Sequence, residues 1–420
     1  MKKIKYLLLV LFFMLAMLTS CASAPMDGDY AGSYGDSYKD SSSGDIPANP
    51  GEDDMAPQLQ PGQLTVAAYD DNEHYEFWNG LATSTQEGEG LFSKYHTDFT
   101  FKTLNRIKIT VPKEVQTKVY LLDNLQANDL QSVLFIGQSD ASGVCYLYAP
   151  EKAESYRICL EYYQNNETEP VRYYDTITGD TEYNLTGISK EQEIIQIMFV
   201  IDATGSMGDE LEYIKVEVTD IMSQVEEAFQ NTKLELAVMV YRDYADSYVT
   251  KYSDFTTDFS SQKSFLNKQS ASGGGDFEEA VHTALAEAAG KQWRQFAKTK
   301  ILFHIADAPS HNEDVTAWKR AVHTLAEQGV HIITVASSGI DKKTEYFFRS
   351  QSILTNGKYV YLTNDSGIGG DHLEATVEER PVVEFLNACL VRLIKGYHTG
   401  TFEEPVHWQQ VVKQEQNEQQ

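Results

Sequence analysis

The chain has 420 residues, enough for two or three domains that each bury a core. Lys and Arg total 34 against 62 Asp and Glu, which gives a formal net charge of -28 at pH 7. This acidic balance argues against nucleic acid or an anionic membrane surface as the partner, because both attract clustered positive charge. Hydrophobic residues make up 42% of the chain, which excludes a mostly disordered protein.

The N-terminus predicts export. Lysines within the first five residues precede an apolar run from Leu7 to Leu18, and the sequence "LTSC" then ends at Cys21. A short apolar run behind positive charges is typical of a signal peptide rather than of a membrane-spanning helix. The "LTSC" box resembles the lipobox of bacterial lipoproteins, in which cleavage precedes a cysteine that is then lipidated. An ordinary signal peptide followed by a chance cysteine is the alternative.

Residues 1–20 are therefore predicted to be a lipoprotein signal peptide and Cys21 a lipidation site. The mature protein would be exported and anchored by lipid, at the outer membrane, on the periplasmic face or on the cell surface. Residues 21–60 are rich in Ser, Gly, Asp and Pro and predict a disordered acidic tether. Residues 61–100 mix acidic and aromatic side chains, and their role stays open.

Between residues 101 and 186, short apolar runs with a period of two are separated by turn signals. This spacing predicts a small antiparallel β-sandwich. The stretch "SDASGVCYLY" weakly resembles the carboxypeptidase-regulatory type of sandwich, with an Ig-like type as the alternative. Cys145 and Cys159 lie on two of these strands, and a hairpin folded near Lys152 would set them opposite each other. A disulfide could then form in an exported protein, and two free thiols are the alternative.

From residue 192, strands alternate with long helical patterns, which predicts an α/β fold with a parallel sheet. The run "IIQIMFVID" is continuously apolar, as expected for a strand that is covered by helices on both faces. The alternation ends near residue 398. The Gln-rich residues 399–420 are predicted to be a disordered tail.

Aspartates end three of these strands, at Asp202, Asp243 and Asp307, and Asp276 follows three glycines at the start of a helix. Parallel strands deliver their carboxyl ends to one edge of the sheet, where ligands bind. Several carboxylates that converge on one edge are unfavourable unless a cation lies among them. Ligands that are all oxygen favour a hard ion, with Mg²⁺ expected first and Mn²⁺ or Ca²⁺ as alternatives.

The sequence "DATGS", residues 202–206, resembles the Asp-x-Ser-x-Ser signature of von Willebrand factor A domains, with Thr204 in place of the first Ser. The resemblance covers residues 192–398. Taken together, "DATGSM", "YRD", "GGGD" and "IADAPSH" look most like the branch found beside α-kinases and in hemicentin-like extracellular proteins. The family resemblance implies a Rossmann-like sheet with helices on both faces and a metal-ion-dependent adhesion site.

The implied metal ligands share oxygen side chains on three loops: Asp202, Thr204, Ser206, Asp276 and Asp307. Many family members have Thr where this chain has Asp276, so this residue could instead only cap its helix. Asp243 and His311 are expected outside the ligand set. Asp243 could pair with its neighbour Arg242, and His311 could line the rim.

No HExxH, GxSxG, Walker or kinase motif is present, so an enzyme is not expected. The predicted function is a lipid-anchored extracytoplasmic binding protein that adheres to a protein partner through its metal site. An acidic side chain of the partner could complete the coordination, while lipid alone would contact the membrane. The alternative is a structural scaffold or assembly factor of an envelope complex, in which the metal only stabilises the fold.

Overall fold

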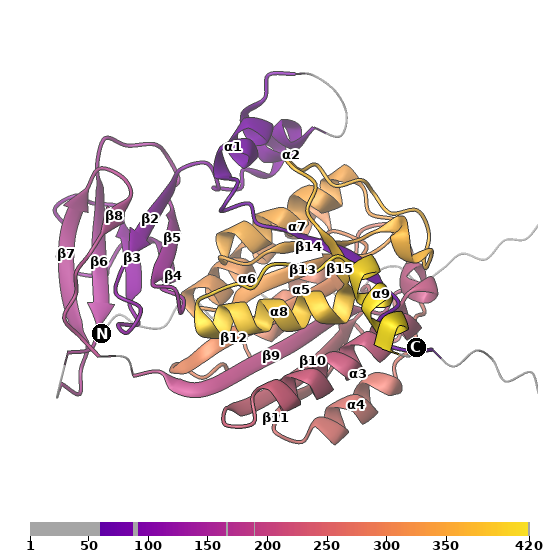
Figure 1. Ribbon diagram of the computed structural model, residues 1–420. Helices are drawn as coiled ribbons and strands as arrows, with labels where there is room; N and C mark the ends of the chain where they lie inside the picture. The colour runs from indigo at the N-terminus through magenta and orange to yellow at the C-terminus, as the bar shows by residue number, and fades with distance from the viewer. Residues whose placement is uncertain (1–58, 87–90, 165–166, 189, 419–420) are drawn as a thin grey trace, which may run out of the picture. The chain divides into compact units, whose positions relative to one another are not determined.

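The computed structural model describes residues 59–86, 91–164, 167–188 and 190–418 (Figure 1). The predicted signal peptide, the predicted lipidation site Cys21 and nearly all of the predicted tether lie outside these ranges. Within them, no helix is long and apolar enough to cross a membrane.

An eight-stranded sheet organises the α/β region, in the order β11-β10-β9-β12-β13-β14-β1-β15. The five strands from β10 to β14 in this order run parallel, whereas β11, β1 and β15 pair antiparallel with their neighbours. The strands are β1 (Thr65–Tyr69), β9 (Gln192–Asp202), β10 (Lys233–Tyr241), β11 (Thr250–Thr256), β12 (Ala297–Ala306), β13 (His331–Ala336), β14 (Tyr359–Leu362) and β15 (Val383–Phe385).

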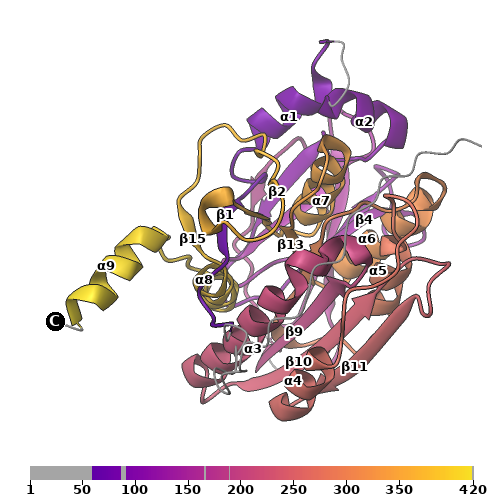
Figure 2. The same cartoon turned by 90° about the vertical axis from the view of Figure 1, so that its right-hand side faces the viewer.

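Helices cover both faces of this sheet (Figures 1 and 2). Alternate residues of β9 show the two layers, because Phe199 and Ile201 belong to one hydrophobic core and Met198 and Val200 to the other. The first core is covered by α3 (Leu211–Ala228), α4 (Phe259–Asn267) and α8 (Leu386–Thr399), and the second by α5 (Val281–Ala289), α6 (Val315–Glu327) and α7 (Lys342–Leu354). The predicted α/β class is confirmed.

One strand of the sheet comes from far upstream. Strand β1 lies between β14 and β15, so the segment 61–100, left open by the sequence, contributes to the α/β sheet. Two buried charged groups, the Glu217 carboxylate and the Arg349–Asp71 ion pair, fix this segment to the α/β region. Glu217 in α3 accepts backbone N–H groups from this segment, including that of Leu64 at 3.2 Å, and Arg349 in α7 pairs with Asp71. Both side chains of the Arg349–Asp71 pair are buried.

Two short helices follow β1. They are α1 (Tyr75–Thr83) and α2 (Phe92–Phe99). Trp78 of α1 stacks on Tyr346 of α7 with ring centroids 5.7 Å apart, and Phe101 stacks on Trp318 of α6 at 4.6 Å. The segment before the β-sandwich therefore packs on the helices of the α/β region through aromatic rings.

The predicted sandwich forms as two sheets, in the orders β5-β2-β8 and β4-β3-β6-β7. All pairs are antiparallel except the short parallel pair of β2 and β8. Inward side chains from both sheets, such as Ile109 and Leu160, share one core. The strands are β2 (Arg106–Thr110), β3 (Lys118–Leu122), β4 (Val133–Gln138), β5 (Val144–Tyr148), β6 (Tyr156–Tyr162), β7 (Val171–Ile177) and β8 (Thr181–Glu182).

The cysteines of the sandwich are not bridged, which corrects the disulfide considered above. Cys145 and Cys159 are free and buried, as is Cys389 in α8. Strand β5 pairs with β2, while β6 pairs with β3 and β7, so the expected hairpin does not form. Cys145 lies in the core between the sheets, and Cys159 packs on Tyr120 in a small separate cluster. Burial raises the pKa of the Cys159 thiol to about 11.

The C-terminal segment also differs from the prediction. Within residues 399–420, which were expected to be disordered, Trp408–Glu418 form helix α9. The Trp408 ring lies 6.1 Å from that of Phe385 in β15, and its indole N–H donates to Asp365 Oδ2 at 3.1 Å. Gln, Glu and Lys are good helix formers, and an aromatic anchor at the first turn fixes the start of this helix.

Candidate metal centre

The carboxyl ends of β9 and β12 bring two aspartates to one edge of the sheet. The strands are parallel neighbours with Ile201 opposite Ile305, so Asp202 and Asp307 leave the sheet side by side. Both are buried, with Asp202 fully inaccessible and Asp307 4% exposed. This placement follows directly from the two apolar strands that precede them.

The loop after β9 holds Asp202 in a fixed orientation. Thr204 donates both its backbone N–H, at 2.8 Å, and its hydroxyl, at 2.7 Å, to Oδ1 of Asp202. The hydroxyls of Thr204 and Ser206 are 3.1 Å apart. A short 3₁₀ helix, η1 (Gly205–Asp209), begins here, but the side chain of Thr204 makes no capping bond to it. The oxygens of this loop are therefore directed at the site rather than at the helix end.

Three carboxylate oxygens near this edge are buried and have no hydrogen-bond partner in the part of the chain that the structure describes. They are Oδ2 of Asp202, Oδ1 of Asp307 and Oε2 of Glu279. Buried polar atoms are normally paired, and an isolated buried carboxylate is strongly unfavourable. Orphaned, buried carboxylate oxygens of this kind are what a divalent cation would satisfy, so the residues present fit such an ion.

The same burial shifts the acidity of these groups. Burial and the charge of Asp307 raise the pKa of Asp202 to about 7, although the bonds from Thr204 oppose the shift. Burial raises the pKa of Asp307 to about 6. Burial, then the charges of Asp202, Asp243 and Asp307, raise the pKa of Glu279 to about 9. Each carboxyl group holds its proton more tightly than usual because burial disfavours its charged form.

Glu279 is a site residue that the sequence did not reveal. It is 2% exposed, and its backbone pairs with that of Ser310, which joins the Gly-rich loop to the loop after β12. A Cβ on Gly274 would lie 3.1 Å from Oε1 of Glu279 and 3.5 Å from Cβ of Thr204. An acidic residue at the start of a helix is usually predicted to be a cap or a surface residue, and no sequence pattern here indicates that Glu279 is buried.

The Gly-rich loop needs its glycines for close approach. Gly273 has φ 85° and Gly274 φ 78°, in the left-handed region that favours glycine. A Cβ at Gly273 would overlap the carboxylate of Asp246. That carboxylate accepts the backbone N–H groups of Gly274, at 3.0 Å, and of Asp243, at 3.1 Å. Asp246 thus ties the Gly-rich loop to the loop after β10.

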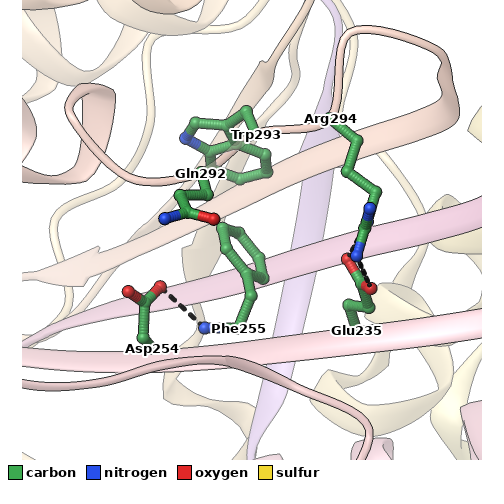
Figure 3. A pocket seen from close by; sticks show the side chains of 6 residues that line it. All are labelled: Glu235, Asp254, Phe255, Gln292, Trp293 and Arg294. Atoms are coloured by element: carbon green, nitrogen blue, oxygen red, sulfur yellow. Dashed lines mark hydrogen bonds and ion pairs between the residues drawn. The ribbon is translucent and has the colours of Figure 1, made fainter.

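A polar cavity of about 360 Å³ lies away from these aspartates (Figure 3). The Glu235–Arg294 ion pair, at 2.7 Å, forms part of its lining, together with Asp254, Phe255, Gln292 and Trp293. Glu235 pairs with Gln196, six residues before Asp202 on β9. Six strand residues span about 20 Å, so this cavity belongs to the other end of the sheet.

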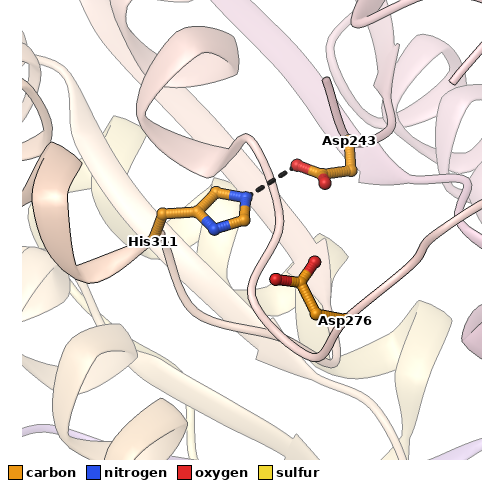
Figure 4. Close-up of side chains that lie close together, drawn as sticks. All are labelled: Asp243, Asp276 and His311. Carbon is orange, nitrogen blue, oxygen red and sulfur yellow. Dashed lines mark hydrogen bonds and ion pairs between the residues drawn. The ribbon is translucent and has the colours of Figure 1, made fainter. Parts of the chain in front are cut away.

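Asp276 lies in a second group, with Asp243 and His311 (Figure 4). One ligand atom of each lies within 4.8 Å of the others, and Nε2 of His311 is 2.7 Å from Oδ1 of Asp243. Burial alone would lower the pKa of His311, but the bond to Asp243 and the charges of Asp243 and Asp276 outweigh it and raise that pKa. Asp243 does not pair with Arg242, which donates instead to the carbonyls of Ala203 and Ser270.

An aromatic residue borders this second group. Tyr244 stacks on His311 with ring centroids 5.5 Å apart, and it is 50% exposed. Its hydroxyl lies 2.6 Å from Nε2 of His282 and donates to Oδ2 of Asp314 at 3.0 Å. His282, in α5, therefore belongs to a hydrogen-bonded network beside the site.

Residues 196–374 match the family model described as von Willebrand factor A domain. This part of the chain is a von Willebrand factor A domain. Such domains commonly mediate protein–protein interactions and often bind a divalent cation. The matched range excludes β1, β15 and α8, which complete the sheet and its cover in this chain.

The domain is also similar to parts of larger proteins. An ariadne-like RING finger protein of Acanthamoeba polyphaga mimivirus is 26% identical over 189 residues, 41% of this chain and 18% of the relative. Alpha-protein kinase vwkA of Dictyostelium discoideum is 22% identical over 173 residues, 41% of this chain and 27% of the relative. The chain thus matches only a fraction of these relatives' length. The crystal structure of the conserved hypothetical protein BatB from Bacteroides thetaiotaomicron aligns with 40% of this chain and 89% of its own, at 18% identity and a TM-score of 0.31.

Proposed function

We propose that the von Willebrand factor A domain of this chain binds a protein partner through a divalent cation held by Asp202, Thr204, Ser206 and Asp307. The observation that carries the proposal is the set of orphaned, buried carboxylate oxygens at the carboxyl edge of β9 and β12. Mg²⁺ is the first expected ion, with Mn²⁺ or Ca²⁺ as alternatives, because the donors are all oxygen.

Each residue has a distinct part in this proposal. Asp202 and Asp307 supply the negative charge, and Thr204 holds Asp202 so that its Oδ2 stays free. Ser206 is exposed and adds a hydroxyl next to that of Thr204. Glu279 contributes the third buried carboxylate near Asp202. A bound divalent ion would supply an open coordination position that a partner's carboxylate can occupy.

Binding rather than catalysis is proposed for this site. The hydroxyls of Thr204 and Ser206 contact a carboxylate and each other, rather than a histidine or lysine that would activate them. The sequence carries none of the common nucleophile or metalloprotease motifs. The site therefore offers charge for recognition and lacks an evident nucleophile–base pair.

Export and lipid anchoring complete the proposal. They rest on the N-terminal charges, the short apolar run and the "LTSC" box that ends at Cys21. Metabolic labelling with a radioactive fatty acid tests this part. Label should enter the wild-type chain and be absent from Cys21→Ser, whereas equal labelling of both would show that no lipid is attached at this residue.

A pull-down from envelope extracts tests the binding function. The full chain should capture a partner in Mg²⁺ and release it in chelator, and Asp202→Asn should capture none while its circular dichroism stays unchanged. Asp254→Asn, which alters an exposed acid in β11, is the matched control and should behave as wild type. Equal capture in chelator and in Mg²⁺ would reject metal-dependent adhesion and favour the scaffold role.

A further inference from the structure

The cluster in Figure 4 has a different chemistry from the site at Asp202. We infer that Asp243, Asp276 and His311 form a second metal site, which takes a divalent transition-metal ion of the zinc class. The inference does not depend on the proposed adhesion function, because that function is proposed on Asp202, Thr204, Ser206 and Asp307. Asp276, which the family resemblance placed among the ligands of the first site, lies in this second group instead.

Three separate loops supply the three ligands. Asp243 follows β10, Asp276 follows the glycines, and His311 follows β12. Their ligand atoms lie within 4.8 Å of one another, and the three side chains point toward a common space (Figure 4). Ligand atoms around a tetrahedral zinc ion are ~3.4 Å apart, given metal–ligand distances of about 2.1 Å. Nε2 of His311 and Oδ1 of Asp243 are hydrogen-bonded at 2.7 Å, closer than this spacing, so a bound zinc ion would part them by ~0.7 Å. The more widely spaced ligand atoms, which lie within 4.8 Å of one another, would move closer.

The charges of this group are not balanced by other residues. Within the described ranges, neither Asp243 nor Asp276 forms an ion pair with a lysine or arginine, and His311 is the one cationic partner of Asp243. The nearest acid in sequence, Glu278, is paired with Lys343 at 2.6 Å. Two carboxylates that face one imidazole therefore keep a net negative charge even when His311 is protonated.

A buried acid, Glu279, lies between this group and the site at Asp202 and feels the charges of both. Glu279 is 2% exposed, its Oε2 has no hydrogen-bond partner, and it lies three residues beyond Asp276 on the same loop. The charge of Asp243, besides those of Asp202 and Asp307, acts on Glu279. An ion held by Asp243, Asp276 and His311 would offset the carboxylate repulsion on this side of Glu279.

The ligand types at this second site indicate which ion it would bind. One imidazole nitrogen with two carboxylates suits Zn²⁺ and its neighbours, whereas Mg²⁺ and Ca²⁺ prefer oxygen alone. Three protein ligands leave a fourth position open, toward the exposed side where Asp276 and Tyr244 lie. The two sites should therefore be separable by metal type.

Zinc binding in the presence of excess Mg²⁺ tests this inference. The full chain is stripped with chelator, dialysed into saturating Mg²⁺ and titrated with Zn²⁺, and bound zinc is measured by equilibrium dialysis with elemental analysis. Wild type should bind one tight equivalent of Zn²⁺. His311→Ala and Asp276→Asn should each weaken that binding by at least about tenfold, because each removes a ligand.

Two further variants separate this site from others. Asp307→Asn should bind zinc as wild type does, even if it abolishes all Mg²⁺ binding. Zinc binding therefore tests the second site even if the proposed Mg²⁺ site does not exist. His407→Ala, in the segment before α9, is the matched histidine control and should bind zinc as wild type does. Equal zinc binding by wild type and His311→Ala, or no tight zinc in Mg²⁺, would reduce the cluster to a His–carboxylate ion pair and overturn the inference.

Discussion

Thr204 donates twice to one oxygen of Asp202, through its backbone N–H at 2.8 Å and its hydroxyl at 2.7 Å, and Oδ2 of Asp202 is left buried and unpaired. A carboxylate held in this way is oriented before any ligand arrives. The arrangement favours binding of a cation, because Oδ2 of Asp202 is buried and has no hydrogen-bond partner among the described residues.

Neutralising Asp202 should therefore have opposite effects with and without metal. In chelator, Asp202→Asn should raise the free energy of unfolding by about 1–3 kcal/mol, because it removes a buried, uncompensated charge. In Mg²⁺ it should lack the stabilisation that wild type gains on binding the ion. Urea denaturation of both proteins, with Asp254→Asn as control, measures the two effects. A variant that is less stable than wild type in chelator would argue against a strained metal-free site.

Stability should depend on pH in a direction set by the raised pKa values. The folded-state pKa is about 7 for Asp202, 6 for Asp307 and 9 for Glu279, each above its usual value. Because the folded protein binds these protons more tightly than the unfolded chain, protonation of the three carboxyl groups raises the free energy of unfolding. This contribution is complete below about pH 4 and is lost as the pH rises through the folded-state values of about 6 to 9.

The metal-free protein should accordingly gain stability from this site as the pH falls from 8 to 5. Bound Mg²⁺ should weaken or reverse this trend, because the ion competes with protons for the same oxygens. The difference in urea midpoint between wild type and Asp202→Asn, followed against pH in chelator, isolates the contribution of Asp202. A difference that stays constant between pH 5 and 8 would contradict the assigned shift.

The buried pair of Arg349 and Asp71 should be essential to the fold. Arg349→Met leaves Asp71 buried without its cation, and it leaves Glu345 with Lys342 as its remaining cationic partner. The expected loss is about 3–5 kcal/mol in the free energy of unfolding. Adding Asp71→Asn to Arg349→Met should recover part of it, which a double-mutant cycle measures. Fully additive losses would show that the two residues do not interact.

A fragment that begins at residue 192 should be a poor substitute for the whole chain. It lacks β1, so β14 and β15 lose the strand between them and present open edges. Fragment 192–398 is expected to aggregate or unfold at lower temperature than fragment 59–418, as calorimetry and light scattering would show. Equal stability of the two fragments would mean that β1 does not stabilise the sheet.

The sequence predicts the central sheet well because its strands are continuous apolar runs with aspartates at their ends. Asp202 and Asp307 meet for that reason alone, since neighbouring parallel strands end at the same edge. Strand β1 is not predictable in this way. "TVAAY" is short, lies over a hundred residues from its partners, and is placed by the buried charges of Glu217 and Asp71.

The pairings that sequence reasoning missed depend on tertiary contacts. Cys145 and Cys159 are close in sequence, but the two-sheet topology sends their strands to different sheets. Asp276 looks equivalent to the other acids in the sequence, yet the loop places it with His311 and buries Glu279 instead. Spacing identifies which loops converge, whereas packing decides which acid of a loop faces inward.

Direct titration of Mg²⁺ into the chelator-treated full chain tests the central claim most closely. Calorimetry should detect a Mg²⁺ site in wild type and in Asp254→Asn, and none in Asp202→Asn or Asp307→Asn at the same concentrations. Mg²⁺ binding that persists in both Asp202→Asn and Asp307→Asn would contradict the claim that these two aspartates hold the ion.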